Sequence, residues 1–347
     1  MRTAFVNMDF LPEVDVLPYM PALAIRNGVG GPCAKRIIAM NRIMLAALAT
    51  AGVLIAGAGR AQQPTTPPVG PDWSKVELTT TDLGRGTYLL AGSGVNTTVA
   101  LADDGVIIVD GQYAPLNAKT KAAIEALSKQ PVRFLVNTHH HSDHSGGNEG
   151  FAKDGVTIVA HVNARNRLAA GTTHNITGAR TPPVPDAALP ARTHTDGTSL
   201  ELKGRTAQLK YAPGAHTDGD TYVYFAEANV LATGDTMTLG RYPNIDFLNG
   251  GNIKGMIEAA DTYLALADDA TKIVPGHGPL AGKAQLAEYR AMLVTSRDRM
   301  ATLIAEGKSE ADIAAAKPFT DLDAKWAVNE QAGRNWIRVV YVSLKGL

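Results

Sequence analysis

The sequence predicts an α/β protein built as an αββα sandwich, in which two strand-rich layers pack face to face between helices. Clusters of strand-like segments closed by helical segments occur twice along the chain. This is the pattern of two sheets that each bury one face against the other sheet and one face against helices. Histidines and aspartates also fall just beyond the ends of several predicted strands, so one edge of the sandwich is the expected functional site.

The first half of the chain supplies one strand cluster. Short apolar and β-branched runs at residues 87–90, 97–101 and 106–109 predict strands, and the pattern at 114–129 predicts the helix that closes them. Strands at 132–136 and 156–160 and a helix at 161–170 continue the alternation. A polar, proline-rich segment at 172–198 separates this half from the next.

The second half repeats the arrangement. Strands recur up to residue 233, and a helix with apolar residues at helical spacing precedes a strand that ends at His277. Those apolar residues are Met256, Ile257, Ala260, Tyr263 and Leu264. Beyond Pro279 the sequence predicts helices at 282–306 and 309–316, and an apolar tail at 335–341 that packs either on the domain or on another subunit.

The segment at residues 138–147, THHHSDHSGG, is the most informative part of the chain. It places His139, His141, Asp143 and His144 in the order H-x-H-x-D-H, on the turn after the predicted strand 132–136. Imidazole nitrogens and carboxylate oxygens are ligands that Zn²⁺ and similar divalent metals prefer. A histidine-rich surface loop or an expression tag is the alternative, but a tag would be terminal and would lack the interleaved aspartate. The segment therefore predicts a metal-dependent hydrolase.

Two further histidines and a carboxylate also lie just after predicted strands. His216 follows the strand-like run 206–211, and His277 follows another apolar run through a Pro-Gly turn. The dipeptide Gly234-Asp235 follows residues 230–233 and places a second carboxylate at a predicted strand end. Nucleophile-elbow, phosphate-loop and dinucleotide-binding motifs are absent from the sequence, so no competing chemistry is indicated.

These motifs resemble the metallo-β-lactamase-fold superfamily of metallohydrolases, over residues 82–279. The hallmark of that family is H-x-H-x-D-H followed by a single histidine, a Gly-Asp and a final Gly-His. The Gly234-Asp235 pair is similar to the glyoxalase-II and lactonase branches in particular. The resemblance implies one metal on His139, His141 and His216, a second metal on Asp143, His144 and His277, and Asp235 as a bridge between them.

The resemblance also implies a chemistry. Two zinc ions per chain, with iron as the alternative metal, would lower the pKa of a shared water and supply hydroxide at neutral pH. Asp143 would orient this nucleophile, and the metals would offset the charge that develops on a carbonyl oxygen. Asp110, at the end of the strand 106–109, matches an acid of the family's pattern and is expected to orient a ligand histidine or its loop.

Composition narrows the functional classes. The chain has 33 basic and 33 acidic side chains and no polybasic stretch, so nucleic acid is not an expected partner. Its single cysteine, Cys33, lies upstream of the predicted domain, so that domain has no thiolate ligand and no disulfide. A small-molecule substrate is expected, and the oligomeric state is left open.

The N-terminal region predicts a secreted or periplasmic protein. Met40 opens a charged, then apolar, then small-residue pattern over residues 40–61 that is typical of a secretory signal peptide. We expect residues 1–39 to be an upstream mis-start, residues 62–73 a proline-rich linker, 74–281 the catalytic domain and 282–347 a helical extension that packs on it. The apolar run is short for a spanning helix, so no stable membrane anchor is expected.

The substrate is not determined by these motifs, because one fold serves many reactions. A β-lactam, a lactone and a thioester all remain open as carbonyl substrates. Arg241, in a glycine-rich loop after Asp235, is predicted to bind a substrate carboxylate, and His174 to line the mouth of the site. The alternatives are an oxidoreductase resembling the mononuclear iron persulfide dioxygenases of the same fold, and a noncatalytic zinc-binding protein.

Overall fold

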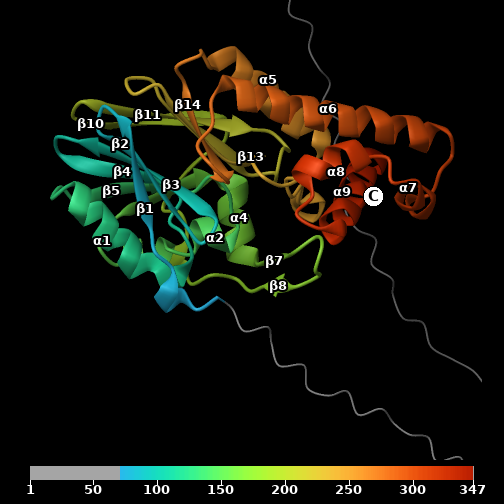
Figure 1. Cartoon of the computed structure of the whole chain (residues 1–347). Helices are drawn as coiled ribbons and strands as arrows, with labels where there is room; N and C mark the ends of the chain where they lie inside the picture. Colours follow the sequence, from blue (N-terminus) through green and yellow to red (C-terminus); the bar gives the residue numbers. More distant parts are fainter. Residues whose placement is uncertain (1–70, 347) are drawn as a thin grey trace, which may run out of the picture. The chain divides into compact units, whose positions relative to one another are not determined.

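The computed structural model describes residues 71–346. The predicted mis-start segment 1–39, the signal peptide 40–61 and nearly all of the linker 62–73 lie outside the described residues. Within them, two sheets face each other and helices cover both outer surfaces, as Figure 1 shows. The predicted αββα sandwich is confirmed.

The first sheet has seven strands, in the order β1-β2-β3-β4-β5-β6-β9. Its first four strands pair antiparallel, and β4, β5, β6 and β9 run parallel. The carboxyl ends of β4 and β5 therefore meet at one edge of the sheet. The strands are β1 (Thr79–Gly84), β2 (Thr87–Gly92), β3 (Val95–Ala102), β4 (Gly105–Val109), β5 (Val132–Val136), β6 (Thr157–His161) and β9 (Arg192–His194).

The second sheet has five strands, in the order β10-β11-β12-β13-β14. All neighbours pair antiparallel except β13 and β14, which are parallel. The strands are β10 (Gly197–Leu202), β11 (Arg205–Ala212), β12 (Asp220–Phe225), β13 (Val230–Thr238) and β14 (Lys272–His277). A separate two-stranded ribbon of β7 (Thr172–Thr173) and β8 (Arg180–Thr181) projects beside them.

Strand β4 shows why these sequences form a sandwich. Ile107 and Val109 lie in the apolar core between the sheets, while Val106 and Ile108 lie in the core under the helices. Because successive side chains of a strand point to opposite faces, a strand buried on both faces needs an uninterrupted apolar run. The sequence VIIV at residues 106–109 meets that requirement.

Helices cover the outer faces of both sheets. On the first sheet, α1 and α3 bury Ile124 and Phe151. On the second sheet, α5 and α6 share one apolar core with the C-terminal helices, which includes Met256, Leu293 and Trp336. The helices are α1 (Asn117–Leu127), α2 (Ser142–Ser145), α3 (Asn148–Ala152), α4 (Val162–Ala170), α5 (Ile253–Leu266), α6 (Lys283–Ala305), α7 (Glu310–Ala316), α8 (Thr320–Trp326) and α9 (Glu330–Lys345).

The apolar tail at 335–341 belongs to α9, which packs on the second sheet's helices rather than standing free. Several elements have no counterpart in the sequence prediction. Strand β1 exposes its first four residues, so it carries no apolar alternation, and α2 and α3 are too short to show a helical period. The polar segment 172–198 contains β7, β8 and β9, of which β9 extends the first sheet.

Among residues 71–346, every helix is too short or too polar to cross a lipid bilayer.

The shared core predicts a large effect of one truncation. Leu293 of α6 is fully buried, so Leu293→Ala should lower the free energy of unfolding by about 2–5 kcal/mol through lost burial and a residual cavity. Chemical denaturation measures this. The matched change Leu266→Ala removes the same atoms from a side chain that is 38% exposed and should cost clearly less. Equal losses for the two variants would contradict the packing described here.

Candidate metal centre

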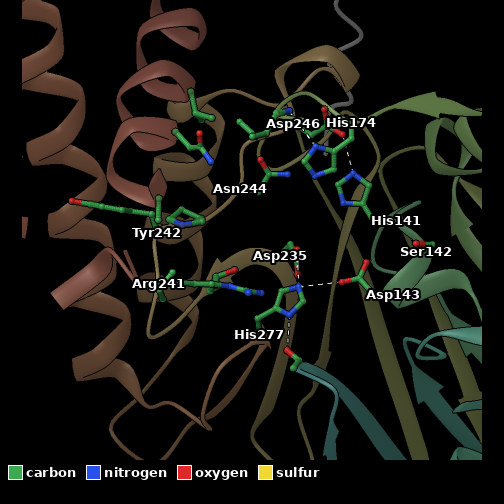
Figure 2. Close-up of a pocket in the computed structure, with 18 of the residues that line it drawn as sticks. His141, Ser142, Asp143, His174, Asp235, Arg241, Tyr242, Asn244, Asp246 and His277 are labelled. Carbon is green, nitrogen blue, oxygen red and sulfur yellow. Dashed lines mark hydrogen bonds and ion pairs between the residues drawn. The ribbon is translucent and has the colours of Figure 1, made fainter. Parts of the chain in front are cut away.

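Histidines and aspartates from both sheets converge at one edge of the sandwich. His139 and His141 follow β5, Asp143 and His144 lie in α2, and His216 lies in the β11–β12 loop. Asp235 lies in β13, and His277 is the last residue of β14. The structure therefore brings together every residue that the resemblance implies as a metal ligand, and Figure 2 shows several of them around the cavity.

Asp235 is not at a strand end, where the sequence places it. Strand β13 continues to Thr238, and its pairing with β14 shifts register on both sides of Gly234. Gly234 has φ +53°, and a Cβ there would lie 2.4 Å from Thr138 Oγ1. Only glycine fits that turn of the backbone, so an irregularity inside the strand, rather than its end, presents Asp235 to the site.

The converging atoms form two adjacent groups. One contains His139, His141, His216 and Asp235, the other Asp143, His144 and His277, and in each the nitrogen and oxygen atoms lie within 4.8 Å of one another. Asp235 connects them, because its Oδ2 lies 3.6 Å from His216 Nε2 and 3.2 Å from His277 Nε2. These groupings match the implied ligand sets, whose roles as ligands stay predictions.

Each of the five predicted ligand histidines has one ring nitrogen that points away from the centre of the site, the outward nitrogen, and this nitrogen makes a hydrogen bond. A carboxylate or carbonyl oxygen can only accept, so the ring nitrogen facing it must carry the hydrogen, and the other nitrogen then presents a lone pair to the site. The outward contacts are His141 Nε2 to Asp246 at 2.8 Å, His144 Nδ1 to Asp110 at 2.7 Å, His216 Nδ1 to the Asn244 carbonyl at 2.7 Å, His277 Nδ1 to the Gly94 carbonyl at 2.6 Å and His139 Nδ1 to Thr138 Oγ1 at 3.0 Å.

This arrangement of hydrogens requires positive charge in the centre. His141 Nδ1 and His216 Nε2 lie 3.0 Å apart, and both outward nitrogens already hold the hydrogen of a neutral ring. His139 Nε2 is buried and makes no hydrogen bond, and His144 Nε2 and Asp235 Oδ1, which lie 3.2 Å apart, are buried without a hydrogen bond as well. Lone pairs brought this close and removed from water repel unless a cation or protons lie between them. The donor set therefore fits divalent metal ions with nitrogen and oxygen ligands.

The pKa shifts of Asp143 and His277 also indicate that the site requires positive charge. Burial acts against ionisation at Asp143, but the imidazoles of His144 and His277 outweigh it and lower the pKa of Asp143 to about 2. Burial likewise disfavours protonated His277, yet Asp235 and Asp143 raise its pKa to about 9. In the protein without metal, protons on the second group therefore take the place of a cation.

Asp110 lies where a residue that orients His144 must lie. Its carboxylate accepts hydrogen bonds from the Thr138 backbone N–H at 2.8 Å, from Thr138 Oγ1 at 2.9 Å and from His144 Nδ1. Asp110 has φ 66° and Gln112 φ 63°, a left-handed conformation that is unfavourable for both residue types. The buried side chain of Gln112 donates to the Val95 carbonyl at 2.9 Å and so holds the turn in place.

Asp246 orients His141 from the other side, a role that no sequence pattern indicates. It follows no strand and belongs to no ligand motif. In the structure it is 1% exposed, and Asn249 Nδ2 also donates to its Oδ2 at 2.7 Å. Arg167 in turn donates to Asn249 at 3.0 Å. A chain of hydrogen bonds from α4 thus fixes the direction of one ligand histidine.

A cavity of about 540 Å³ opens over the two groups. Arg241 and His174 line it, and the role of Arg241 in binding a substrate carboxylate stays a prediction. Figure 2 shows the Arg241 side chain pointing toward His277 and Asp235. Arg241 is the only lysine or arginine among the lining residues, and within residues 71–346 it forms no ion pair. Asn249 and Asn252, from the same loop region, instead bind backbone and side-chain partners within the protein.

His140 differs from expectation. Placed between two ligands in sequence, it is expected to point away from them, but its ring centroid lies 4.6 Å from that of His141 and it lines the cavity. Both of its ring nitrogens are buried without a hydrogen-bond partner. With His141 and Asp246 it forms a third group whose spacing suits a metal ion, although Asp246 already binds His141 there.

Comparison with known proteins identifies the family and the fold. The family profile described as "Metallo-beta-lactamase superfamily" matches residues 90–277. This range includes every predicted ligand, from His139 to His277, and also Asp110 and Asp246.

Two curated relatives match part of the chain. The alpha subunit of 2,4-dinitroanisole O-demethylase from Nocardioides sp. is 31% identical over 205 residues, which is 57% of this chain and 57% of that protein. The hydroxyacylglutathione hydrolase of Brucella anthropi is 32% identical over 142 residues, 38% of this chain and 46% of that protein. The chain thus spans about half the length of these relatives.

Solved structures share the fold. A metallo-beta-lactamase from Pontibacter korlensis superposes with a TM-score of 0.52 at 20% identity, covering 63% of this chain and 99% of that one. The sec-alkylsulfatase Pisa1 from Pseudomonas sp. gives a TM-score of 0.57 at 19% identity, covering 76% and 50%. At these identities the likeness concerns the fold alone.

The orienting carboxylates predict how metal binding responds to mutation. Asp110→Asn and Asp246→Asn keep the size of each side chain but weaken the hold on His144 and His141. Each should lower the affinity for zinc roughly 10–100-fold, measured by competition with a chromogenic chelator. Asp269→Asn, at an exposed residue away from the cavity, is the matched control. Unchanged zinc affinity in both variants would show that these contacts do not support a metal centre.

Proposed function

The chain belongs to the metallo-beta-lactamase superfamily, and on that premise we propose that it is a zinc-dependent hydrolase that cleaves small carbonyl substrates. The observation that carries the proposal is the convergence of histidine ring nitrogens and carboxylate oxygens in the candidate metal centre. Five histidines use their outward nitrogens for hydrogen bonds, and the five inward nitrogens meet two carboxylates. A site that needs cations and opens on a cavity supports metal-dependent catalysis better than a structural metal role.

The proposed ligands divide into two sets. His139, His141 and His216 would hold one zinc ion, and Asp143, His144 and His277 the other, with Asp235 shared between them. When bound, two such ions lower the pKa of a water toward neutrality and stabilise negative charge on a carbonyl oxygen.

Asp143 has the role of directing the nucleophile. The neighbouring imidazoles hold its pKa at about 2, so the carboxylate stays ionised at neutral pH and acts as a hydrogen-bond acceptor. It lines the cavity, with its Oδ2 3.4 Å from His277 Nε2 and 3.5 Å from His144 Nε2. From that place it orients the proton of a water on the cavity side and accepts a proton during attack.

Arg241 supports a substrate that carries one acidic group. A single unpaired guanidinium in the lining binds a carboxylate through charge-assisted hydrogen bonds, whereas phosphate esters are usually bound by several cations. β-Lactams and many thioesters carry such a carboxylate. The relatives named hydroxyacylglutathione hydrolase support a thioester, and the relative named for 2,4-dinitroanisole adds an aryl ether to the substrates worth assaying.

We also propose that the protein acts outside the cytoplasm. The support is the pattern of residues 40–61, in which a charged start, an apolar run and small residues follow one another. N-terminal sequencing of the protein from a periplasmic fraction would test this, and a chain recovered intact from Met1 in the cytoplasm would overturn it.

The first functional prediction concerns Asp143. The zinc-loaded full chain should hydrolyse at least one member of a panel containing a carbapenem, a hydroxyacyl glutathione thioester, an acyl lactone and 2,4-dinitroanisole. Asp143→Asn should lower kcat by at least about 100-fold, because it removes the ionised acceptor beside the nucleophile.

Zinc content measured on the same Asp143→Asn sample separates lost orientation from lost metal. Turnover that survives the substitution would contradict the proposal. An iron-loaded chain that consumes oxygen with a persulfide, and hydrolyses no member of the panel, would support the dioxygenase alternative.

The second prediction concerns Arg241. Arg241→Ala should raise KM at least about tenfold for a substrate with a free carboxylate, because a charge-assisted hydrogen bond is lost. The methyl ester of the same substrate is the matched control, and its KM should change little. If the KM values of the variant for both compounds equal those of the wild type, Arg241 has no role in substrate binding.

A further inference from the structure

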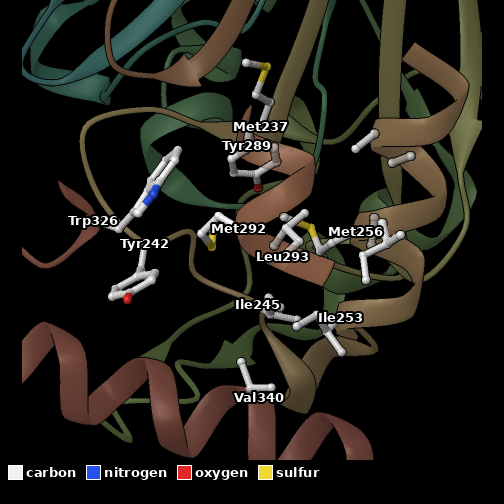
Figure 3. Packing of buried hydrophobic residues seen from close by; sticks show 14 of the residues in the cluster. Met237, Tyr242, Ile245, Ile253, Met256, Tyr289, Met292, Leu293, Trp326 and Val340 are labelled. Atoms are coloured by element: carbon white, nitrogen blue, oxygen red, sulfur yellow. The ribbon is translucent and has the colours of Figure 1, made fainter. Parts of the chain in front are cut away.

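Helix α9 packs on the core and also lines the cavity. Ile337 and Val340 belong to the core alone, and Figure 3 shows Val340 close to Ile245 and Ile253. Trp336 and Val339 are buried in the same core and also line the cavity, together with Ala332 and Asn335. Helix α9 thus forms one wall of the cavity and contributes no residue to the metal centre.

The aromatic residues of this wall present carbon rather than polar atoms. Trp336 and Tyr242 stack with ring centroids 4.9 Å apart and planes 11° from parallel. Trp336 Nε1 donates to Ser296 Oγ at 3.0 Å, and the Tyr242 hydroxyl donates to Asp323 at 2.9 Å. Since both polar hydrogens are bonded within the protein, neither is available to a ligand as a donor, and the wall is apolar in character.

The apolar wall continues to the rim. Val328, between α8 and α9, is 65% exposed, more than the other exposed large hydrophobic side chains of the described residues. It lines the same cavity as Ile176, which comes from the loop between β7 and β8. A single exposed valine is common on protein surfaces. Val328, however, extends the apolar wall of a cavity beside the candidate metal centre, which indicates contact with a ligand.

Arg241 shows how a ligand would be placed. Its side chain points toward His277 and Asp235 (Figure 2), while the ring of the next residue, Tyr242, stacks on Trp336 of the apolar wall. An acidic group held by Arg241 therefore leaves the rest of the molecule free to extend along α9. The cavity of about 540 Å³ is within the size range of small-molecule sites.

We propose that the α8–α9 wall, formed by Val328, Ala332, Trp336 and Val339 with Tyr242 and Ile176, is a subsite for an apolar acyl chain of the substrate. The substrates are then acyl compounds with a medium-length apolar chain, rather than the smallest polar acyl groups. As a statement about substrate specificity, this inference rests on the proposed hydrolase function. Binding of an apolar acyl chain, however, can be measured independently of turnover.

Binding of carboxylic acids, which are the products of acyl hydrolysis, tests the subsite directly. Calorimetry on the zinc-loaded full chain should give a lower Kd for hexanoate than for propanoate by at least tenfold, since each fully buried methylene contributes roughly a fourfold gain. Val328→Asp and Ala332→Asp should each reduce the ratio of the propanoate Kd to the hexanoate Kd at least threefold. This ratio is compared because an added negative charge weakens the binding of both acids alike.

Leu266→Asp is the matched control. It places the same charge on an exposed leucine outside the cavity lining and should leave the ratio unchanged. Equal Kd values for the two acids, or a ratio that both wall variants leave intact, would overturn the subsite. A chain-length preference in binding without hydrolysis of any panel substrate would keep the subsite and overturn the proposed hydrolase function instead.

Discussion

The buried carboxylate of Asp110 joins the elements on which the rest of the site depends. It accepts two hydrogen bonds from Thr138 in the turn after β5 and one from His144 in α2, so three segments are fixed by one side chain. Thr138 Oγ1 in turn contacts His139 Nδ1 at 3.0 Å. The direction of two predicted ligands thus follows from one charge that is 2% exposed. Such a charge is stable only with all its partners in place, which makes the arrangement cooperative.

Much of this could be predicted from the sequence, because the strongest signals are local. The run VIIV at 106–109 and the order H-x-H-x-D-H depend on neighbouring residues alone, and both are where the sequence predicts them. Asp246 could not be predicted, since its importance arises only when the loop after β13 folds back beside His141. The position of Asp235 depends likewise on an irregularity between β13 and β14, which no local pattern reveals. Long-range pairing, rather than residue type, is the missing information.

The C-terminal helices connect stability with specificity. Helix α9 contributes Ile337 and Val340 to the core under the second sheet, and its Trp336 and Val339 both pack in that core and line the cavity. The scaffold that holds the histidines is common to lactamases, sulfatases and thioester hydrolases, so it carries no information on the substrate. Residues outside the ligand motifs, above all Arg241 and the α8–α9 wall, are where this chain's choice of substrate is expected to lie. The Tyr242–Trp336 stack connects the α8–α9 wall to the segment that carries Arg241.

We propose that the inward nitrogens and carboxylates of this site hold two metal ions. Anomalous diffraction from crystals of the zinc-loaded protein, recorded on either side of the zinc absorption edge, would locate them. We expect two peaks, one among His139, His141 and His216 and one among Asp143, His144 and His277, with Asp235 between them. No peak at this edge of the sandwich, or a single peak at the third group that includes His140, would contradict it.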